Sequence, residues 1–158
     1  PLLVIEPAIA LLEQHQYRAI DPDYPSELVT PLARFLEARL HRLPTPSSAG
    51  AVQLLGHCAE KSLAPEHSQA YRRLLEAVGY QVTVPLVTCC GMAGIFGHER
   101  ENLAMSRDVF DLSWRTRLEG AENVVACAPG YSCRSQVKRF ASRKIAHPIE
   151  LVAERLDS

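Results

Sequence analysis

This sequence of 158 residues lacks the features that would assign it to several large classes of protein. It has no apolar run of the roughly 20 residues that a membrane-spanning helix needs, and its first residues do not form a secretory signal peptide. The 17 basic and 18 acidic residues almost balance, so the charge does not favour a nucleic acid or an anionic membrane as a partner. We also find no internal repeat, no low-complexity tract and no motif of a hydrolase. The composition, 47% hydrophobic, is that of one globular domain with a real core.

Cysteine is the informative residue type. Five cysteines are an odd number in a chain without a secretory signal, which favours a reducing compartment and metal or redox chemistry over a disulfide framework. We therefore expect a cytoplasmic protein, with a peripheral position at the inner face of the membrane as the alternative. Because the chain starts on an apolar run without methionine, we also expect it to be a fragment of a longer protein.

The hydrophobic pattern predicts an α/β fold. Apolar runs predict strands over 2–5, 51–55, 80–84, 123–126 and 144–146, and helical spacing predicts helices over 8–14, 66–78, 99–118, 132–142 and 148–156. A further helix is expected to follow Thr30 and Pro31, read as its N-cap and first residue. Strands that alternate with long helices pair in parallel, so we expect a three-layer sandwich with a mostly parallel sheet.

A loop rich in proline and serine, 44–50, is the best internal boundary. It separates a lead-in, residues 1–50, from the part that carries every cysteine, residues 51–158.

The adjacent pair Cys89 and Cys90 is the strongest candidate for a site. The pair follows the predicted strand 80–84, while Cys58 follows 51–55 and Cys133 follows 123–126. Because the carboxyl ends of parallel strands lie along one edge of a sheet, we expect the four thiols to meet there. The helices that follow would direct their N-termini at the thiols and stabilise thiolate, the form that binds metal or reacts.

The loop after the pair contains three glycines, Gly91, Gly94 and Gly97. Glycines would let the backbone approach the sulfurs closely and donate N–H groups to them. The loop lacks the lysine of a nucleotide-binding P-loop, and the alternative is a plain turn between strand and helix.

Other residues near the predicted site have two readings each. Cys127 is expected to be a buried structural thiol, with an accessory ligand as the alternative. His57 is expected to be a polar neighbour of the site, or a ligand if the metal is zinc. His98 would donate a hydrogen bond near the site or be exposed. The basic run 134–144 would form a solvated helix face. Alternatively, Arg134 would compensate anionic thiolates and the rest of the run would dock a partner domain.

The segments 88–99 and 130–136, together with Ser113-Trp114, resemble the cysteine-rich CCG domain. This domain occurs twice in one component of heterodisulfide reductase, and also in the iron–sulfur component of glycolate oxidase and in lactate-utilisation proteins. It ends fusion proteins that join an FAD-linked D-lactate or D-2-hydroxyglutarate dehydrogenase to a ferredoxin-type segment. The resemblance covers residues 51–156, and the opening 2–17 is similar to the end of a preceding cysteine-rich repeat.

The resemblance implies that an iron–sulfur cluster, of the 4Fe–4S class, is held by Cys58, Cys89, Cys90 and Cys133 beside the loop of Gly91 and Gly94. The chain departs from the family pattern at Gly130, where a further cysteine is common, and at Ile9 in the lead-in. The implied function is electron transfer within an FAD-dependent oxidoreductase of a D-2-hydroxy acid.

The same resemblance implies partners in one chain: a preceding cysteine-rich repeat, a ferredoxin-type domain and a flavin domain that holds FAD. It leaves the electron acceptor open and implies no dehydrogenase activity for this part alone. The residues themselves leave two alternatives. One is a zinc-binding or metal-free structural module, and the other is a thiol–disulfide redox site.

Overall fold

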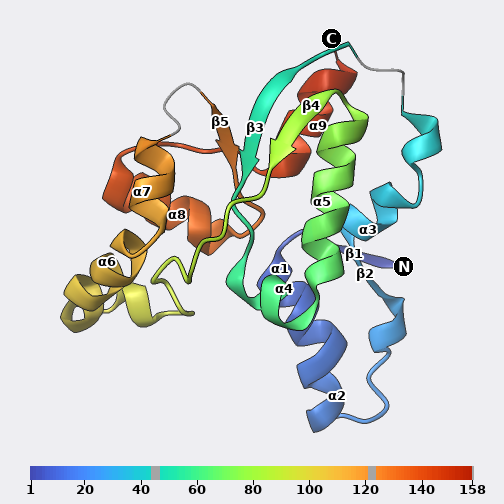
Figure 1. The fold of residues 1–158 in the computed structure, drawn as a ribbon. Coiled ribbons are helices and arrows are strands. Elements are labelled where there is room, and N and C mark those ends of the chain that lie inside the picture. Colours follow the sequence, from blue (N-terminus) through green and yellow to red (C-terminus); the bar gives the residue numbers. More distant parts are fainter. Residues whose placement is uncertain (44–46, 121–123, 158) are drawn as a thin grey trace.

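The computed structural model describes residues 1–43, 47–120 and 124–157, and it contains two parallel sheets (Figure 1). In the smaller sheet β1 pairs with β2, and in the larger the strand order is β4-β3-β5. The strands are β1 (Leu2–Val4), β2 (Val29–Pro31), β3 (Gly50–Leu54), β4 (Tyr80–Thr83) and β5 (Val125–Cys127). The predicted α/β class with parallel pairing is therefore confirmed.

The described helices include those of the lead-in, residues 1–50, and those that pack on the larger sheet. In chain order they are α1 (Pro7–Leu11), the π-helical η1 (Leu12–Gln16), α2 (Tyr17–Ile20), η2 (Ser26–Leu28), α3 (Leu32–Glu37), η3 (Leu40–Arg42), α4 (Cys58–Leu63), α5 (Pro65–Ala77), η4 (Phe96–His98), η5 (Arg100–Asn102), α6 (Leu103–Asp111), α7 (Trp114–Glu119), α8 (Tyr131–Ala141) and α9 (Pro148–Leu156).

Two hydrophobic clusters hold these helices to the strands. The first joins Val52 and Leu54 of β3 to α3, α5 and α9. The second joins Ala126 of β5 to α6, α7 and α8, with Phe110 and Trp114 at its centre. Figure 1 shows α6, α7 and α8 on one side of the strands and α3 and α5 on the other.

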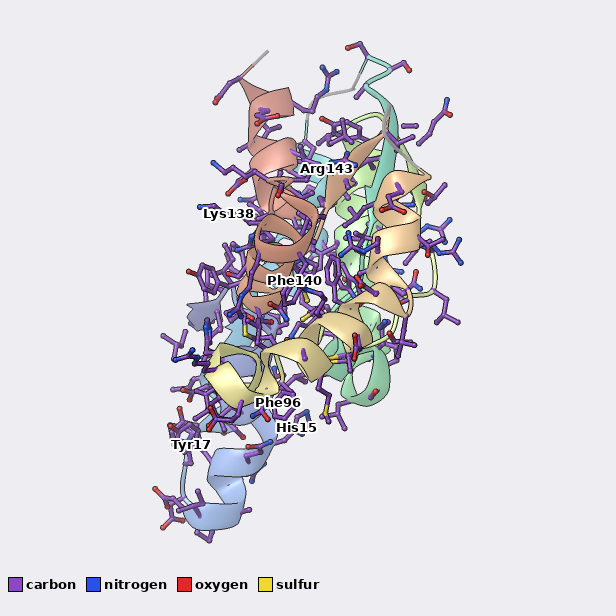
Figure 2. All side chains as sticks on the ribbon, turned by 90° about the vertical axis from the view of Figure 1, so that its left-hand side faces the viewer. His15, Tyr17, Phe96, Lys138, Phe140 and Arg143 are labelled. Carbon is purple, nitrogen blue, oxygen red and sulfur yellow. The ribbon has the colours of Figure 1, made fainter. Side chains whose placement is uncertain are left out.

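Phe140 of α8 closes the second cluster against α6. Its ring centroid lies 5.6 Å from that of Phe110, and the side chain points among the packed residues in Figure 2. Phe110 and Trp114 are both fully buried, whereas Leu103 at the start of α6 is only half-buried.

The expected helix over 99–118 is wrong as one element. It is divided into η5, α6 and α7, with the break at Leu112 and Ser113. Ser113 leaves helical geometry with φ −150°, and its hydroxyl oxygen accepts a hydrogen bond from the backbone N–H of Thr88 at 2.8 Å. The tertiary contact thus outweighs the local helical preference.

Smaller differences concern the segments between helices. Thr30 lies in β2 and Pro31 precedes the first turn of α3, so the predicted N-cap at Thr30 is wrong. Helix α4 is not anticipated by the sequence analysis, and the predicted strand over 144–146 is a single bridge from Ala146 to Cys127. Residues 44–46 of the predicted loop and Asn123 of the predicted strand lie outside the described residues.

The lead-in packs on the part of the chain that carries the cysteines. Helix α1 lies against α4, and α3 lies against α5. The carboxylate of Glu6 accepts a hydrogen bond from the backbone N–H of Tyr131 at 2.8 Å, across 125 positions of sequence. These contacts bring the start of the chain to the edge of the sheet where α4 and α8 begin.

None of the described helices is long and apolar enough to cross a membrane.

The packing of α5 on the sheet gives a test of the fold. Leu75 is completely buried, and Leu75→Ala should lower the free energy of unfolding by about 2–5 kcal/mol because it leaves a cavity. Leu63 is 62% exposed, so Leu63→Ala should change it by no more than about 0.5 kcal/mol. Urea unfolding of both variants measures the difference, and equal losses would contradict this packing.

Candidate functional site

Four of the five cysteines follow strands of the larger sheet. Cys58 is the first residue of α4 after β3, the pair Cys89 and Cys90 lies in the loop after β4, and Cys133 lies in the first turn of α8 after β5. Because β3 pairs in parallel with both neighbours, these segments leave the sheet in the same direction.

The sulfurs of these residues interact across the segments. Cys58 interacts with Cys89, and Cys90 interacts with Cys133 and with Cys89. The interaction with Cys89 and burial raise the pKa of Cys58, and the interactions with Cys133 and Cys89 raise that of Cys90. The structure therefore joins the four sulfurs in one chain of contacts, and none of them is in a disulfide bond.

Cys89 is the group whose charged form this arrangement favours. Hydrogen bonds from the thiols of Cys58 and Cys90, followed by the backbone N–H groups of Gly91 and Ala93, lower the pKa of Cys89. The Gly91 N–H lies 3.4 Å from the Cys89 sulfur. A thiolate at Cys89 with thiols beside it is a nucleophile and a potential ligand.

A cavity of about 410 Å³ opens beside the sulfurs. Its wall contains Cys58, Cys89 and Cys90, with His57 and Glu6 as polar neighbours. The rest of the wall consists of small residues and the start of α8, namely Ala8, Ala59, Ala93, Gly94, Tyr131 and Ser132. The cavity is thus lined mainly by sulfur and small side chains.

Sulfur donors suit soft or iron-containing groups. Among the described residues, no group of three or more His, Cys, Asp or Glu side chains is arranged to hold a metal ion. The chain of sulfur contacts is therefore not a preformed site for a single ion such as zinc, whose ligands converge at about 2.0–2.3 Å.

The loop glycines contact helix α6 as well as the thiol site. Gly91 donates to Cys89 with φ +84°, but a Cβ at Gly91 would lie 2.1 Å from the carbonyl oxygen of Ser106. A Cβ at Gly97 would lie 2.8 Å from the Ser106 hydroxyl oxygen. The absence of a side chain at Gly91 and Gly97 therefore allows helix α6 to pack closely on the loop. Gly94, with φ +70° and open space around it, lines the cavity.

The loop that carries the pair is held by side chains that the sequence analysis did not select. Gln136 donates to the carbonyl oxygen of Cys90 at 3.1 Å, and Ser106 donates to that of Gly91 at 2.7 Å. Both side chains are fully buried. The sequence does contain a signal for them, which is a polar residue on the apolar face of a helix. Ser106 lies one turn from Phe110, and Gln136 lies one turn from Cys133.

The residue before the pair is held in the same way. Trp114 donates from its indole N–H to the carbonyl oxygen of Thr88 at 3.0 Å, next to the bond between Thr88 and Ser113. The Ser113-Trp114 pair thus connects the break between α6 and α7 to the thiol loop.

His57 lies against the site beside Gly130. It is 6% exposed, its Nδ1 atom is buried without a hydrogen-bond partner, and burial lowers its pKa. A Cβ at Gly130 would lie 2.5 Å from the imidazole Cδ2 and 3.2 Å from the Cys133 sulfur. The imidazole ring therefore fills the space that a side chain at position 130 would need.

Three other candidates lie further from the cavity. Arg134 donates to the carbonyl oxygens of Ala128 and Pro129 at 2.8 and 2.7 Å, and it lines a neighbouring cavity of about 260 Å³ with Glu6. His98 is exposed at the end of η4, and Cys127 is completely buried at the end of β5. Burial raises the pKa of Cys127 to about 12, and its burial was expected from the sequence.

Part of the basic run on α8 faces outward, and Lys138 projects from the helix in Figure 2. Arg139 and Arg143 donate to backbone carbonyl oxygens of Gly97 and of Leu118 and Val124. These two arginines therefore fasten α8 to the loops around it.

A buried carboxyl group lies under the site on α4. Glu60 is 1% exposed, and its Oε2 atom has no hydrogen-bond partner. Burial, with a smaller contribution from Glu6, raises the pKa of Glu60 to about 8. The proton on this group is thus retained near neutral pH.

Gly91 and Gly94 provide a matched pair of substitutions. Gly91→Ala should lower the free energy of unfolding by at least about 3 kcal/mol, because it adds a backbone clash to an unfavourable φ. Gly94→Ala meets only the unfavourable φ and should cost about 1–2 kcal/mol. Urea unfolding measures the free energy of unfolding of both variants. A larger decrease for Gly94→Ala than for Gly91→Ala would contradict the close contact between Gly91 and Ser106.

Glu60 should make stability depend on pH. Because its folded pKa of about 8 lies above the unfolded value of 4.5, the folded state binds the extra proton, and stability falls as pH rises between these values. Glu60→Gln keeps a neutral side chain at every pH, so it should remove the contribution of Glu60 to the decrease in the free energy of unfolding with pH. Urea unfolding from pH 6.5 to 8.5 compares the two proteins, and parallel curves would show that Glu60 titrates normally.

Comparison with known proteins places the whole chain beside one group of enzymes. It is 33% identical to a D-2-hydroxyglutarate dehydrogenase of Haemophilus influenzae, over 99% of this chain and 16% of that protein. It is 32% identical to a D-2-hydroxyglutarate dehydrogenase of Pseudomonas putida, over 98% of this chain and 15% of that protein. About half of the chain, 49%, is 34% identical to a component of the anaerobic glycerol-3-phosphate dehydrogenase of Escherichia coli, covering 19% of that component.

No protein-family model matches the chain, and no solved structure matches it significantly. The chain spans only 15% to 16% of the length of the D-2-hydroxyglutarate dehydrogenases that it resembles. The similarity therefore concerns one segment of those enzymes, and it extends over nearly all of the present sequence.

Proposed function

We propose that this chain is the iron–sulfur, electron-transfer domain of a larger FAD-linked oxidoreductase that acts on a D-2-hydroxy acid such as 2-hydroxyglutarate, lactate or glycolate. One observation carries the proposal: four thiols from three separate segments form one chain of contacts beside a cavity. The similarity to D-2-hydroxyglutarate dehydrogenases over nearly the whole chain supports the same assignment.

The residues of the site fit such a group by their chemistry. Cys58, Cys89, Cys90 and Cys133 would hold the cluster, because four thiolates complete the usual ligand set. One-electron transfer is the chemistry that an iron–sulfur cluster supplies when it is bound. The chain's own contribution is to gather the thiols, donate N–H groups to Cys89 and surround the sulfurs with the cavity of about 410 Å³.

The rest of the reaction belongs to other parts of the larger protein. A flavin domain with FAD would take a hydride from the substrate carbon, and a ferredoxin-type domain would carry electrons onward. Residues 2–17 would be the end of a preceding cysteine-rich repeat, and residues 51–158 would form the CCG domain, a three-layer sandwich with the site at the carboxyl edge of its strands. On this proposal the present chain alone does not oxidise a hydroxy acid.

A thiol–disulfide redox site is the second candidate. The contact between Cys58 and Cys89, and the lowered pKa of Cys89, favour it, because a thiolate beside a second thiol can form a disulfide with an external oxidant. A zinc module has less support, since no described group of ligands is arranged for a single ion.

The decisive experiment is anaerobic reconstitution of the chain with ferrous iron and sulfide. We expect protein-bound iron and sulfide in equal amounts and a broad brown absorption. Cys58→Ser and Cys133→Ser should lose most of the bound iron. Cys127→Ser is the matched control, because Cys127 is buried in the core at the end of β5 and its loss should leave the iron content unchanged.

Other outcomes assign the alternatives. Colourless protein that retains tightly bound zinc would support a structural zinc module. Metal-free protein that loses two thiols reversibly on mild oxidation would support the thiol–disulfide site. Iron uptake that depends on Cys127 and not on Cys58 or Cys133 would overturn the proposed ligand set.

A further inference from the structure

The peptide group between Cys90 and Gly91 has a hydrogen bond at each end. Its N–H donates to the Cys89 sulfur at 3.4 Å, and its carbonyl oxygen accepts from the Gln136 side chain at 3.1 Å. A peptide group is planar and rigid, so the orientation of its carbonyl also sets the direction of its N–H. Gln136 on α8 is therefore coupled through one peptide to the sulfur of Cys89.

Gln136 is itself held in one orientation. Its Nε2 atom also donates to the Ser106 hydroxyl oxygen at 2.7 Å, and that hydroxyl donates to the Gly91 carbonyl oxygen at 2.7 Å. Gln136 and Ser106 are both completely buried, where water cannot replace these bonds. The two acceptors around Nε2 define which end of the amide faces the loop.

Helix α6 can supply Ser106 only because glycines stand opposite it. A Cβ at Gly91 would meet the Ser106 carbonyl oxygen at 2.1 Å, and a Cβ at Gly97 would meet its hydroxyl oxygen at 2.8 Å. Two successive carbonyl groups of the loop, those of Cys90 and Gly91, are thus held by different helices. These two hydrogen bonds oppose rotation of the peptide between them away from Cys89.

We infer that Gln136 is a positioning residue of the thiol site, which directs the Gly91 N–H at the Cys89 sulfur through the Cys90–Gly91 peptide, with Ser106 as its anchor. A hydrogen bond to the carbonyl polarises the same peptide and strengthens its N–H as a donor. The redox consequence rests on the proposed function, since hydrogen bonds to ligand sulfurs help to set the reduction potential of an iron–sulfur cluster.

The first test uses the reduced, metal-free chain of 158 residues and does not depend on a cluster. Gln136→Met keeps the length of the side chain and removes the donor. Hydrogen exchange at the Gly91 amide, followed by NMR, should become roughly tenfold faster, because the peptide loses its anchor. Gln53→Met is the matched control, since the Gln53 amide on β3 is also partly buried but lies outside this network, and it should leave the Gly91 amide unchanged.

The second test uses the chain reconstituted with iron and sulfide. Gln136→Met should lower the midpoint potential, because weaker N–H donation stabilises the more negative reduced state less. Loss of iron to a chelator should become roughly 10- to 100-fold more favourable, as for other groups that orient metal ligands. Gln53→Met should match the unsubstituted chain in both measurements.

Unchanged Gly91 exchange and unchanged potential in folded Gln136→Met protein would overturn the inference. If that variant does not fold, Ser106→Ala removes the anchor, and the same exchange measurement decides. If the unsubstituted chain takes up no iron and sulfide, the proposed function fails, while the exchange at Gly91 still confirms or overturns the role of Gln136.

Discussion

The parallel pairing of β3 with β4 and β5 is the constraint on which the thiol site depends. Cys58 and Cys133 are 75 positions apart in the sequence, yet each follows a strand of the same parallel sheet. The sheet is held between two clusters of buried side chains, so the directions in which the three segments leave it are set by the core. The sulfurs lie together because the strands that precede them are paired side by side. No local sequence motif could bring them together alone.

A second constraint acts within the loop after β4. The loop is held at Thr88 by Ser113 and Trp114, and at Cys90 by Gln136. These partners come from α6–α8, the same helices that form the second hydrophobic cluster. The core and the site therefore share their elements, and a change that moves α8 in the core also moves the thiol loop. This coupling explains why Ser106 and Gln136 are buried in an otherwise apolar layer: the Ser106 hydroxyl and the Gln136 Nε2 atom donate to the loop that they position.

Much of this arrangement follows from the sequence, because strand and helix periodicity are local properties. The parallel α/β class, the helices α5 and α9 and the burial of Cys127 could all be predicted in that way. The break at Ser113 could not, since it depends on a hydrogen bond to Thr88, which lies 25 positions away. Gly91 donates to the Cys89 sulfur as expected, but the packing of Gly91 and Gly97 against Ser106 could not be predicted. A glycine indicates that a close approach is needed, and the sequence does not identify the neighbour.

The charges around the sulfurs limit what the site can hold. Lys61 of α4 donates a hydrogen bond to the carbonyl oxygen of Val87. Arg134, in the first turn of α8, donates to the carbonyl oxygens of Ala128 and Pro129. Glu6 adds a negative group to the cavity wall. Four thiolates without compensating charge would be costly in this half-buried place, which agrees with the raised pKa values of Cys58 and Cys90. The sulfurs are therefore favoured as protonated thiols around one anion at Cys89. On the proposed function, metal ions would balance the charge of further thiolates.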